Sequence, residues 1–537
     1  MGIKDYVKFV KREYSNACKK RWLNRYTHLY IDLNHALHHV CHKSNSPKEI
    51  LSKIKSYLNN VITNYRPTHK IYIGADGPAP IAKMVLQRRR RYDKVKTLRS
   101  NEELNLSKNL SLNFTPGTEF MLNLADELRH FTSYLSIVYG VEVELDIEKD
   151  DEGEVKIRRK IEIDQKKDPT LSAIVYSGDA DMILLLISLS RVQNVYQILD
   201  RYTILSFGRM YNIHMQKFSK VSAYNVTDGE FRRVKRKQAS VKRDFIFINL
   251  LFGNDYLPKI MYIKFENIWK AYSEISQNYP MGLVQYDRSK RELTIDREFM
   301  FRLIDRTTGM NRINYDKNFD LNNLGNDDLG LYDDYMKGVA WCFDMYYSGV
   351  CADYRYIYDH SKPPHYDGII LQIMRQNKYV VPKTDSIDSD LYGILLIPEK
   401  AMTLLSNKQK KLSSKLVKLH PIIYEEERCQ KCSNFSKSIS EMNKQANLLR
   451  SETTTESDLV DHQIIGENEI AEDPDELADP DELADPDRRS ELKEDVLAKI
   501  RDSNIRYAKH RTMHDALTLY EIEKIETTFD RLVHEAK

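Results

Sequence analysis

The sequence has few cysteines and no long apolar run. Six cysteines in 537 residues are too sparse for a disulfide framework, which favours a reducing compartment. No segment of membrane length is free of charge, and Met1–Asp5 lacks the apolar core of a secretory signal. Tyr6 stands where a myristoylation signal needs Ser or Thr, so acylation at Gly2 is not expected. We therefore expect a protein of the cytosol or the nucleus.

Charge is distributed unevenly along the chain. Residues 451–537 contain 11 Lys and Arg against 25 Asp and Glu, which leaves 71 against 54 in residues 1–450, a net charge of +17. Hydrophobic residues make up 41% and tyrosines number 34, as in a packed globular protein, although 30% charged residues leave room for disordered parts. A basic body predicts a polyanionic partner, and an acidic tail is usually a solvated spacer.

An acidic repeat separates this body from the C-terminus. The hexapeptide Asp473–Ala478 recurs as Asp479–Ala484, and proline every six residues with dense acid is incompatible with a regular helix. We predict an acidic disordered linker over residues 429–490 and a helical tail over 491–537. Apolar residues at helical spacing in this tail would pack on the body or on a protein partner, and the sequence does not choose between them. They are Ile522, Ile525, Phe529 and Leu532. The lone pair Cys429 and Cys432 has no second pair nearby, so we assign it neither zinc nor function.

Aspartates end two predicted strands in the N-terminal part. Residues 29–31 form a short strand pattern that ends in Asp32, and residues 71–75 form another that ends in Asp76. Residues 50–65 between them have helical spacing, so strand, helix and strand follow in the order that a parallel sheet requires. Because parallel sheets collect functional groups at the carboxyl ends of their strands, both aspartates are candidate site residues.

Asp179 and Asp181 follow a third predicted strand, residues 173–176, and precede an apolar helix that starts near Met182. Carboxylates two residues apart in an extended chain point to one face and suit Mg²⁺ or Mn²⁺. Taken alone, such a segment is more often a helix N-cap. The recurrence of the pattern elsewhere favours a site.

Three further acids extend the set. Glu152 and Glu154 follow a strand pattern at residues 141–145, and Asp255 closes the apolar run 244–252. In isolation these segments would be an exposed loop and a helix C-terminal turn. Converging carboxylates repel one another unless divalent cations neutralise them, so we expect two Mg²⁺ or Mn²⁺ ions and hydrolysis of a phosphodiester. The seven candidate ligands are Asp32, Asp76, Glu152, Glu154, Asp179, Asp181 and Asp255.

A basic helix is predicted over residues 82–92, directly after Asp76 and a Pro-rich turn. A run of arginines in isolation is more often a solvated helix face or a nuclear localisation signal. Its place beside the acidic cluster instead favours binding of a phosphate group.

These motifs resemble the XRN-type 5′→3′ exoribonucleases, a family within the flap-endonuclease-like superfamily. The likeness covers residues 1–260 and continues more weakly through Trp341 and residues 346–350 to about Pro421. The matching blocks are Asp32–Asn34 with His38, Asp76–Met84 with Gln87, Arg88, Arg90 and Arg91, Thr115–Met121, Glu152–Glu154, Asp179–Asp181 and Gly253–Pro258.

The resemblance implies roles for the residues that match. The seven carboxylates would bind the metals, and His38 would stack on the terminal base. The 5′ phosphate would be bound by Lys83, Gln87, Arg90 and Arg91. Two positions depart from the family pattern: Asp151 replaces a glycine, and Tyr354 or Tyr356 stands where a stacking tryptophan is usual, of which we select Tyr356.

The resemblance also implies the architecture. We expect an α/β protein with a mostly parallel central sheet flanked by helices, of the PIN/FEN-like kind, in residues 1–260. Residues 261–428 would form a largely helical second segment that completes the active-site channel. The chain ends before the accessory domains of long family members, and its abundant Lys, Ile, Asn and Tyr are typical of an A/T-rich genome, as in a compact viral member.

The function expected from this resemblance is processive 5′→3′ degradation of 5′-monophosphorylated single-stranded RNA to mononucleotides by a monomeric, metal-dependent enzyme. A structure-specific 5′ DNA nuclease is the alternative, because the superfamily shares the carboxylate site. A catalytically inactive RNA-binding scaffold is a third, disfavoured by the intact ligand set.

Overall fold

The protein is described by a computed structural model that covers residues 6–20, 25–96, 109–147, 149–219, 228–311, 326–360, 363–451, 495–500, 502–503, 506 and 518–536. The chain divides into two compact units. The first contains Met1–Gln87, Ser107–Leu396 and Leu404–Gln409, and the second contains Arg88–Leu106, Ile397–Thr403 and Lys410–Lys537. The domain limits after residues 260 and 490 remain predictions.

The first unit is built on a seven-stranded sheet in the order β1-β7-β6-β5-β2-β3-β4. The strands from β6 through β5, β2 and β3 to β4 are parallel, and β7 and β1 are added antiparallel at one edge. Their bounds are Cys18–Lys19 (β1), His28–Asp32 (β2), Lys70–Gly74 (β3), Glu142–Asp146 (β4), Ala173–Tyr176 (β5), Val195–Asp200 (β6) and Thr203–Ser206 (β7). The predicted mostly parallel α/β sheet is therefore confirmed.

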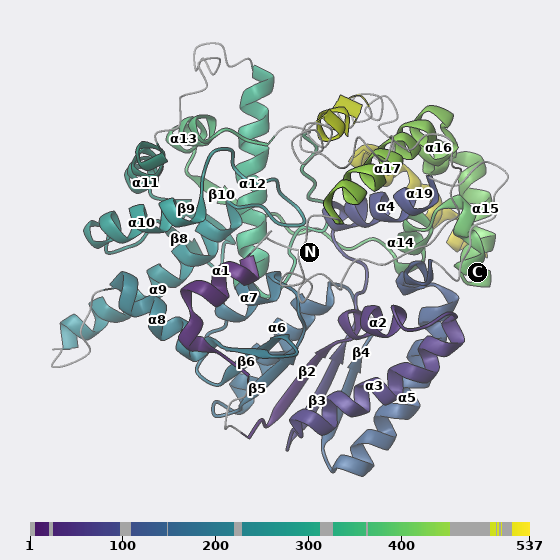
Figure 1. The fold of residues 1–537 in the computed structure, drawn as a ribbon, viewed down its shortest axis with the longest axis horizontal. Coiled ribbons are helices and arrows are strands. Elements are labelled where there is room, and N and C mark those ends of the chain that lie inside the picture. The colour runs from purple at the N-terminus through teal and green to yellow at the C-terminus, as the bar shows by residue number, and fades with distance from the viewer. Residues whose placement is uncertain are drawn as a thin grey trace. The chain divides into compact units, whose positions relative to one another are not determined.

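Helices cover both faces of this sheet, as Figure 1 shows. Leu29 and Ile31 of β2 enter one apolar core, beneath α2 (Leu33–Cys41), α3 (Pro47–Tyr65) and α5 (Glu119–Tyr139). Tyr30 points to the other face, toward α6 (Gly153–Lys167) and α7 (Asp181–Ile187). Because side chains alternate along a strand, a central strand with apolar residues at every position fills two cores at once.

Short-range signals set the helix ends. The Ser46 hydroxyl accepts a hydrogen bond from the Glu49 amide at 3.2 Å and begins α3, which ends at Arg66 in the left-handed conformation. Thr118 caps α5, and its hydroxyl also donates to the carbonyl of Asn113 at 2.6 Å. The block Thr115–Met121, identified from the family resemblance, thus builds a helix N-terminus here.

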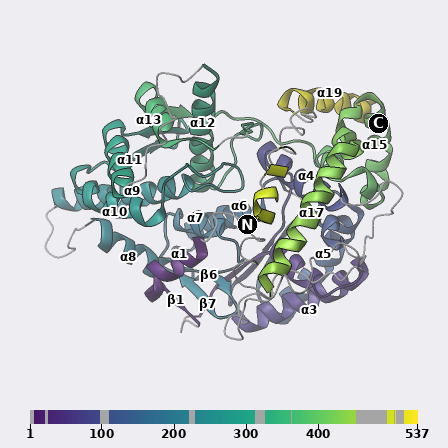
Figure 2. The same cartoon turned by 45° about the horizontal axis from the view of Figure 1, so that its top comes forward.

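The rest of the first unit is mostly helical (Figure 2). It also contains an antiparallel sheet of β8 (Val284–Asp287), β9 (Glu292–Ile295) and β10 (Lys378–Val380), which the sequence analysis did not predict. The helices are α1 (Tyr6–Glu13), α8 (Phe207–Ser219), α9 (Asp228–Leu250), α10 (Phe265–Ile275), α11 (Arg297–Asn311), α12 (Asn326–Ser348), α13 (Tyr366–Arg375) and α14 (Ser389–Leu396). Short 3₁₀ turns of the first unit occur at Ser15–Ala17, Leu110–Phe114 and Ser276–Asn278, whereas Pro421–Tyr424 and most of Glu399–Leu404 belong to the second unit.

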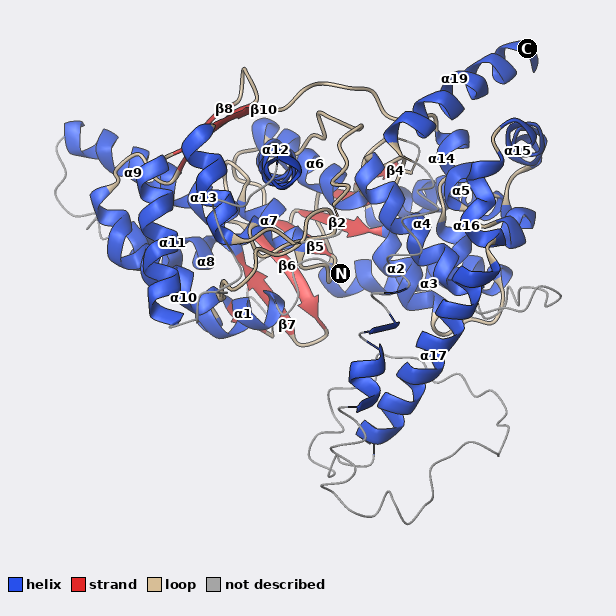
Figure 3. Cartoon of the chain, turned by 90° about the horizontal axis from the view of Figure 1, so that it is seen from above, coloured by secondary structure: helices blue, strands red, loops and turns tan. Residues whose placement is uncertain are grey.

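The described residues of the second unit contain helices and no strand, as the colouring of Figure 3 shows. Helix α4 (Ile81–Lys96) begins in the first unit and continues into the second, and α15 (Asn407–Leu419) does the same. The remaining helices are α16 (Glu425–Arg428), α17 (Gln430–Ser451) and α19 (Leu519–Ala536). No helix in the described ranges is long and apolar enough to cross a membrane.

Helix α17 corrects the start of the predicted linker. Residues 430–451 are helical, with Cys432 buried and Phe435 and Ile439 half-buried on one side. The acidic composition begins only after Ser451, so the boundary at residue 429 was set too early. The acidic repeat itself lies outside the described residues.

The C-terminal helix packs on its own chain. Ile522, Ile525, Phe529 and Leu532 of α19 are all buried, as their helical spacing predicts. Within the second unit, His420 Nε2 lies 2.8 Å from the hydroxyl of Thr528. The apolar face of α19 therefore packs against this chain. The sequence had left open whether it packs on the body or on a protein partner.

Candidate active site

Carboxylates gather at the carboxyl edge of the parallel sheet. Asp32 is the last residue of β2, Asp76 follows β3, and Asp179 follows β5. Because β3, β2 and β5 are neighbouring parallel strands, their ends meet at one edge. Glu154 in the first turn of α6 and Asp181 at the start of α7 add two more acids.

Mutual repulsion shows that these groups are close together. Burial, followed by the charges of Asp32, Asp76 and Asp179, raises the pKa of Glu154 well above its usual value. Burial likewise raises the pKa of Asp181, with contributions from Asp179, Asp255 and Glu152. All seven predicted carboxylates are therefore coupled electrostatically, directly or through one another.

Asp32 is held by the chain on two sides. The hydroxyl of Ser177 donates to one of its oxygens at 3.0 Å, and the amide of His35 donates to the other at 3.1 Å. The bond from the His35 amide makes Asp32 the N-cap of α2. Burial and then the nearby charge of Asp76 raise the pKa of Asp32 to about 7. Asp32 is thus both the N-cap of α2 and a candidate site residue.

Asp76 is clamped by Asn34 and Gly153. The Asn34 side chain donates to one carboxylate oxygen at 2.8 Å, and its own oxygen accepts a bond from the Asp76 amide at 3.2 Å. The amide of Gly153 donates to the other carboxylate oxygen at 2.8 Å. Asn34 belongs to a matching sequence block, but no role was assigned to it. Its place two residues after Asp32, at the start of a helix, was the available signal.

Asp179 and Asp181 form a local pair. The Asp181 amide donates to Asp179 Oδ1 at 3.0 Å, and the Gln197 side chain donates to the Asp179 carbonyl at 3.0 Å. Asp181 Oδ1 is buried and has no hydrogen-bond partner among the residues that the structure describes. A buried acceptor without a donor is costly unless another positive group serves it. Together with an all-carboxylate donor set, this oxygen fits a hard cation such as Mg²⁺.

A lysine compensates part of the acidic charge. Lys83 Nζ lies 2.5 Å from Glu152 and 2.9 Å from Asp255, and its side chain is only 14% exposed. Burial opposes its charge, yet Glu152 and Asp255 raise the pKa of Lys83 well above its usual value. The hydroxyl of Tyr256 also donates to Glu152.

In the described residues, no three His, Cys, Asp or Glu side chains are arranged as a preformed set of metal ligands.

Asp255 reaches the cluster differently from the others. It follows helix α9 and a turn in which Gly253 has a φ of +81°, rather than the end of a strand. A side chain at Gly253 would meet the Lys259 amide at 2.7 Å, so the turn requires glycine. The helix C-terminal turn considered from the sequence is present, and it carries a member of the cluster.

The four predicted phosphate-binding residues lie on α4 at positions that share one face of the helix. Lys83 and Gln87 belong to the first unit, whereas Arg90 and Arg91 belong to the second, where both are half-buried. The Gln87 side-chain oxygen accepts a bond from the Tyr392 hydroxyl at 3.4 Å. On another side of α4, buried Arg88 donates to the Ile423 carbonyl, a structural role within the second unit.

The predicted base-stacking residues differ in exposure. His38 is exposed on α2, with its ring edge-on to Phe114 at 5.3 Å between centroids. Tyr356 stacks one face on Trp341 at 4.7 Å, and its hydroxyl donates to the Asp334 carbonyl at 3.1 Å.

A histidine that the sequence analysis missed lies beside the cluster. The ring of His35 is 5.4 Å from the ring of Tyr176, and a β-carbon on Gly178 would come within 3.0 Å of it. Burial lowers the pKa of His35, and the charge of Asp179 opposes that shift. Its position three residues after Asp32, in the first turn of α2, could have identified it.

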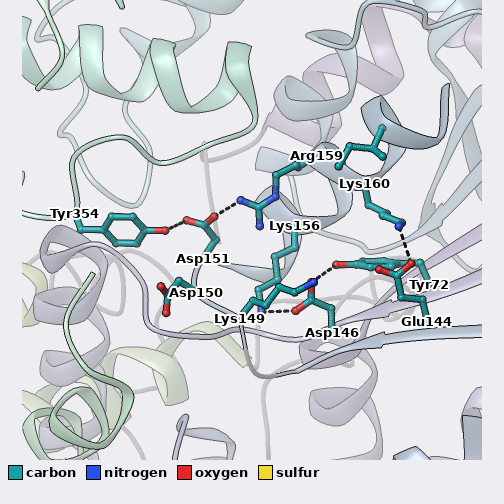
Figure 4. A pocket seen from close by; sticks show the side chains of 11 residues that line it. Tyr72, Glu144, Asp146, Lys149, Asp150, Asp151, Lys156, Arg159, Lys160 and Tyr354 are labelled. Carbon is teal, nitrogen blue, oxygen red and sulfur yellow. Dashed lines mark hydrogen bonds and ion pairs between the residues drawn. The ribbon is translucent and has the colours of Figure 1, made fainter. Parts of the chain in front are cut away.

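A cavity lies elsewhere in the first unit. It has a volume of about 410 Å³ and lies between the end of β4 and α6 (Figure 4). None of the seven clustered carboxylates lines it. Its four cations are each paired with an acid, as with Lys160 and Glu144 at 2.6 Å and Arg159 and Asp151 at 2.7 Å. The carboxylate cluster therefore remains the candidate active site.

Comparison with known proteins finds similarity over part of the chain. Residues 1–201 match the family described as XRN 5'-3' exonuclease N-terminus. The human 5'-3' exoribonuclease 1 (Homo sapiens) is 26% identical over 304 residues, which cover 49% of this chain and 18% of that protein. The 5'-3' exoribonuclease 2 of Kluyveromyces lactis is 32% identical over 195 residues, which cover 29% of this chain and 19% of that protein. The chain thus spans about a fifth of the length of these relatives.

A solved structure of the catalytic core of Rad2 in complex with a DNA substrate also aligns with this chain. It is 10% identical, covers 70% of this chain and 95% of that one, and has a TM-score of 0.32.

Proposed function

We propose that this chain, whose residues 1–201 match the family described as XRN 5'-3' exonuclease N-terminus, is a metal-dependent 5′→3′ exoribonuclease. The observation that carries the proposal is the gathering of seven carboxylates at one edge of the sheet, with a buried oxygen of Asp181 that lacks a donor among the described residues. The relatives that are similar to this chain over part of its length are named 5'-3' exoribonucleases.

The seven carboxylates would hold two divalent cations, Mg²⁺ or Mn²⁺. Such ions supply an activated water and neutralise the charge that develops on the leaving oxygen. The chain prepares their ligands: Asn34 and the Gly153 amide fix Asp76, while Ser177 and the His35 amide fix Asp32. Side chains fixed in this way need little reorganisation during the reaction.

Lys83 would have a second task. In the structure its ammonium group neutralises Glu152 and Asp255. Once these carboxylates have another counter-charge, Lys83 can turn toward a phosphate of the substrate. It would then bind the 5′ phosphate with Gln87, Arg90 and Arg91, which share its face of α4.

The substrate proposed is single-stranded RNA with a 5′ monophosphate, degraded processively to mononucleotides. Each cleavage exposes a new 5′ phosphate for the same basic residues, and stacking by His38 and Tyr356 would hold the terminal base without reading its identity. The net charge of +17 on residues 1–450 supports a polyanionic substrate. We propose that the enzyme acts as a monomer in the cytosol or the nucleus.

The decisive experiment compares matched single-stranded RNA and DNA, each with a 5′ monophosphate and a label at either end. Wild type is expected to release mononucleotides from the 5′ end of RNA with Mg²⁺ and to stop with a chelator. Asp179→Asn is the matched inactive variant. Equal or faster cleavage of DNA would support the 5′ DNA nuclease instead. Binding of RNA without cleavage under any divalent ion would support the inactive scaffold.

A further inference from the structure

Asp151, the residue directly before Glu152, has an unusual backbone conformation. Its φ is +85°, in the left-handed region that residues with a β-carbon disfavour, and it is 2% exposed. Conformations of this kind persist only where surrounding contacts enforce them.

Two side chains hold the carboxylate of Asp151, as Figure 4 shows. The hydroxyl of Tyr354 donates to Oδ1, and the guanidinium of Arg159 donates to Oδ2 at 2.7 Å. Tyr354 comes from the segment after α12, and Arg159 lies on α6. Because both oxygens are engaged by these partners, Asp151 is not counted among the metal ligands.

The backbone of Asp151 is tied to the loop that carries Asp76. Its amide donates to the Pro78 carbonyl at 3.0 Å, and its carbonyl accepts a bond from the Gly77 amide at 2.9 Å. A β-carbon on Gly77 would lie 2.0 Å from the Lys149 carbonyl oxygen, so the two loops are in close contact. These bonds fix the position of Asp76 relative to Glu152.

The segment that contains Tyr354 is also bonded to α4, the helix that carries Lys83. The Tyr354 carbonyl accepts a bond from the Ile81 amide at 2.9 Å, and the Tyr356 carbonyl accepts one from the Ala82 amide at 3.2 Å. Both amides belong to the first turn of α4, directly before Lys83. Tyr354 therefore connects the loop before Glu152 with the start of α4.

We propose that Asp151, Tyr354 and Arg159 form a positioning cluster that sets Glu152 and Glu154 against Asp76 and Lys83. The inference rests on the proposed metal site, and it assigns these three residues no contact with substrate or metal. The left-handed turn at Asp151 gives the chain the direction that brings Glu152 and Glu154 to the sheet edge. The bonds to Tyr354 and Arg159 keep Asp151 in that turn.

The same triad occurs a second time in the first unit and offers a matched control. The hydroxyl of Tyr286 donates to Asp344 Oδ1, and Arg291 donates to Asp344 Oδ2 at 2.8 Å. Asp344 is completely buried, and nothing connects it to the carboxylate cluster in the described contacts. Tyr286→Phe thus removes the same kind of bond as Tyr354→Phe at a site without the proposed role.

The experiment measures Mn²⁺ binding by calorimetry on the full chain, together with the Mg²⁺ dependence of RNA hydrolysis. Tyr354→Phe is expected to weaken Mn²⁺ binding, and to raise the Mg²⁺ concentration for half-maximal rate, by about 10- to 100-fold, as for other groups that orient metal ligands. Tyr286→Phe should lower thermal stability without changing Mn²⁺ binding or the Mg²⁺ dependence. In an Asp151→Gly background, Tyr354→Phe should have no further effect on the metal, because its acceptor is absent.

The outcomes separate the two proposals. Wild-type Mn²⁺ affinity in Tyr354→Phe, or the same loss in Tyr286→Phe, would overturn the positioning role and leave the metal site standing. Wild type that binds no Mn²⁺, or binds it equally well after Asp179→Asn, would overturn the proposed function itself. If Tyr354→Phe does not fold, Arg159→Gln takes its place, and Arg159→Lys should restore most of the affinity.

Discussion

Lys83 and Glu152 form a buried ion pair, with 2.5 Å between Nζ and the nearest carboxylate oxygen. Asp255 shares the same ammonium group at 2.9 Å. One positive charge therefore serves two carboxylates in a cluster of seven, and the metal-free protein retains an excess of buried acid. Stability and metal binding should be linked through this imbalance.

Lys83→Met tests that link. Removing the ammonium group that pairs with Glu152 and Asp255 should lower the free energy of unfolding of the metal-free protein by roughly 3 kcal/mol. Mg²⁺ should restore part of the loss. Urea denaturation with chelator and with Mg²⁺ measures both effects. Lys55→Met, which removes an exposed ion pair with Glu127, should cost much less in either condition, because exposed ion pairs contribute little to stability.

Asp181→Asn should separate chemistry from stability. Because burial and neighbouring acids already raise the pKa of Asp181, a neutral isostere should leave the metal-free protein as stable as wild type or more so. Hydrolysis should fall by at least about 100-fold, since a metal ligand is lost, while RNA binding persists. Thermal melting, a cleavage assay and filter binding check the three statements. Asp126→Asn on the exposed face of α5 is the control, and equal activity of the two variants would contradict the metal assignment.

Changing Arg90 and Arg91 to alanine should reduce selectivity for the 5′ end. Wild type is expected to degrade 5′-monophosphorylated RNA well, and 5′-hydroxyl, triphosphorylated or capped RNA poorly. The double variant should lose at least about tenfold of that preference, because charge-assisted bonds to the phosphate are removed. Arg89→Ala, at an exposed position of the same helix, should keep it. Fast degradation of capped RNA by wild type would assign these arginines to a general RNA-binding face.

Buried Asp244, which is not part of the carboxylate cluster, should make stability depend on pH. It is completely buried, and burial raises its pKa to about 6 although the Tyr272 hydroxyl and the Val284 amide donate to it. A raised carboxyl pKa contributes stability that is fully present below the unfolded pKa, near 4, and is lost as the pH rises through about 6.

Asp244→Asn resembles the protonated form and removes this dependence. Between pH 4 and pH 7 the variant should gain on the order of 2 kcal/mol of unfolding free energy relative to wild type. Urea titrations at intervals across that range measure the difference. A constant difference between the two proteins would show that Asp244 does not titrate in it. Asp287→Asn, in which an exposed carboxylate is changed, should show a much smaller change over the same range.

The sequence predicted the parts of the fold that depend on local patterns. The segments ending at Asp32, Asp76 and Asp179 were found because a buried parallel strand is a continuous apolar run and its end is polar. The small sheet β8–β10 was missed because its strands have three or four residues and β10 pairs with β9 across a long separation in the chain. The helix at residues 430–451 was missed because the predicted acidic linker was begun at residue 429, before the acidic composition starts.

The membership of the acidic cluster was predictable, but its internal bonding was not. Repetition of one pattern selected the seven carboxylates, and family resemblance added Lys83 as a phosphate ligand. The pairing of Lys83 with Asp255 and the clamping of Asp76 by Asn34 join residues far apart in the chain. Only the packed sheet defines such contacts. The position of His35 depends equally on Gly178 leaving space for its ring.

The two outer strands of the central sheet differ in how they meet solvent. At one side β1 is only two residues long, so it covers part of β7 and leaves little backbone with which another chain could pair. At the other side β4 carries Glu142 and Glu144, whose charges are matched by Lys70 from the neighbouring strand. A short strand and charged side chains at its borders both discourage edge-to-edge aggregation. The sheet that holds the carboxylates is thereby a poor template for intermolecular β-pairing.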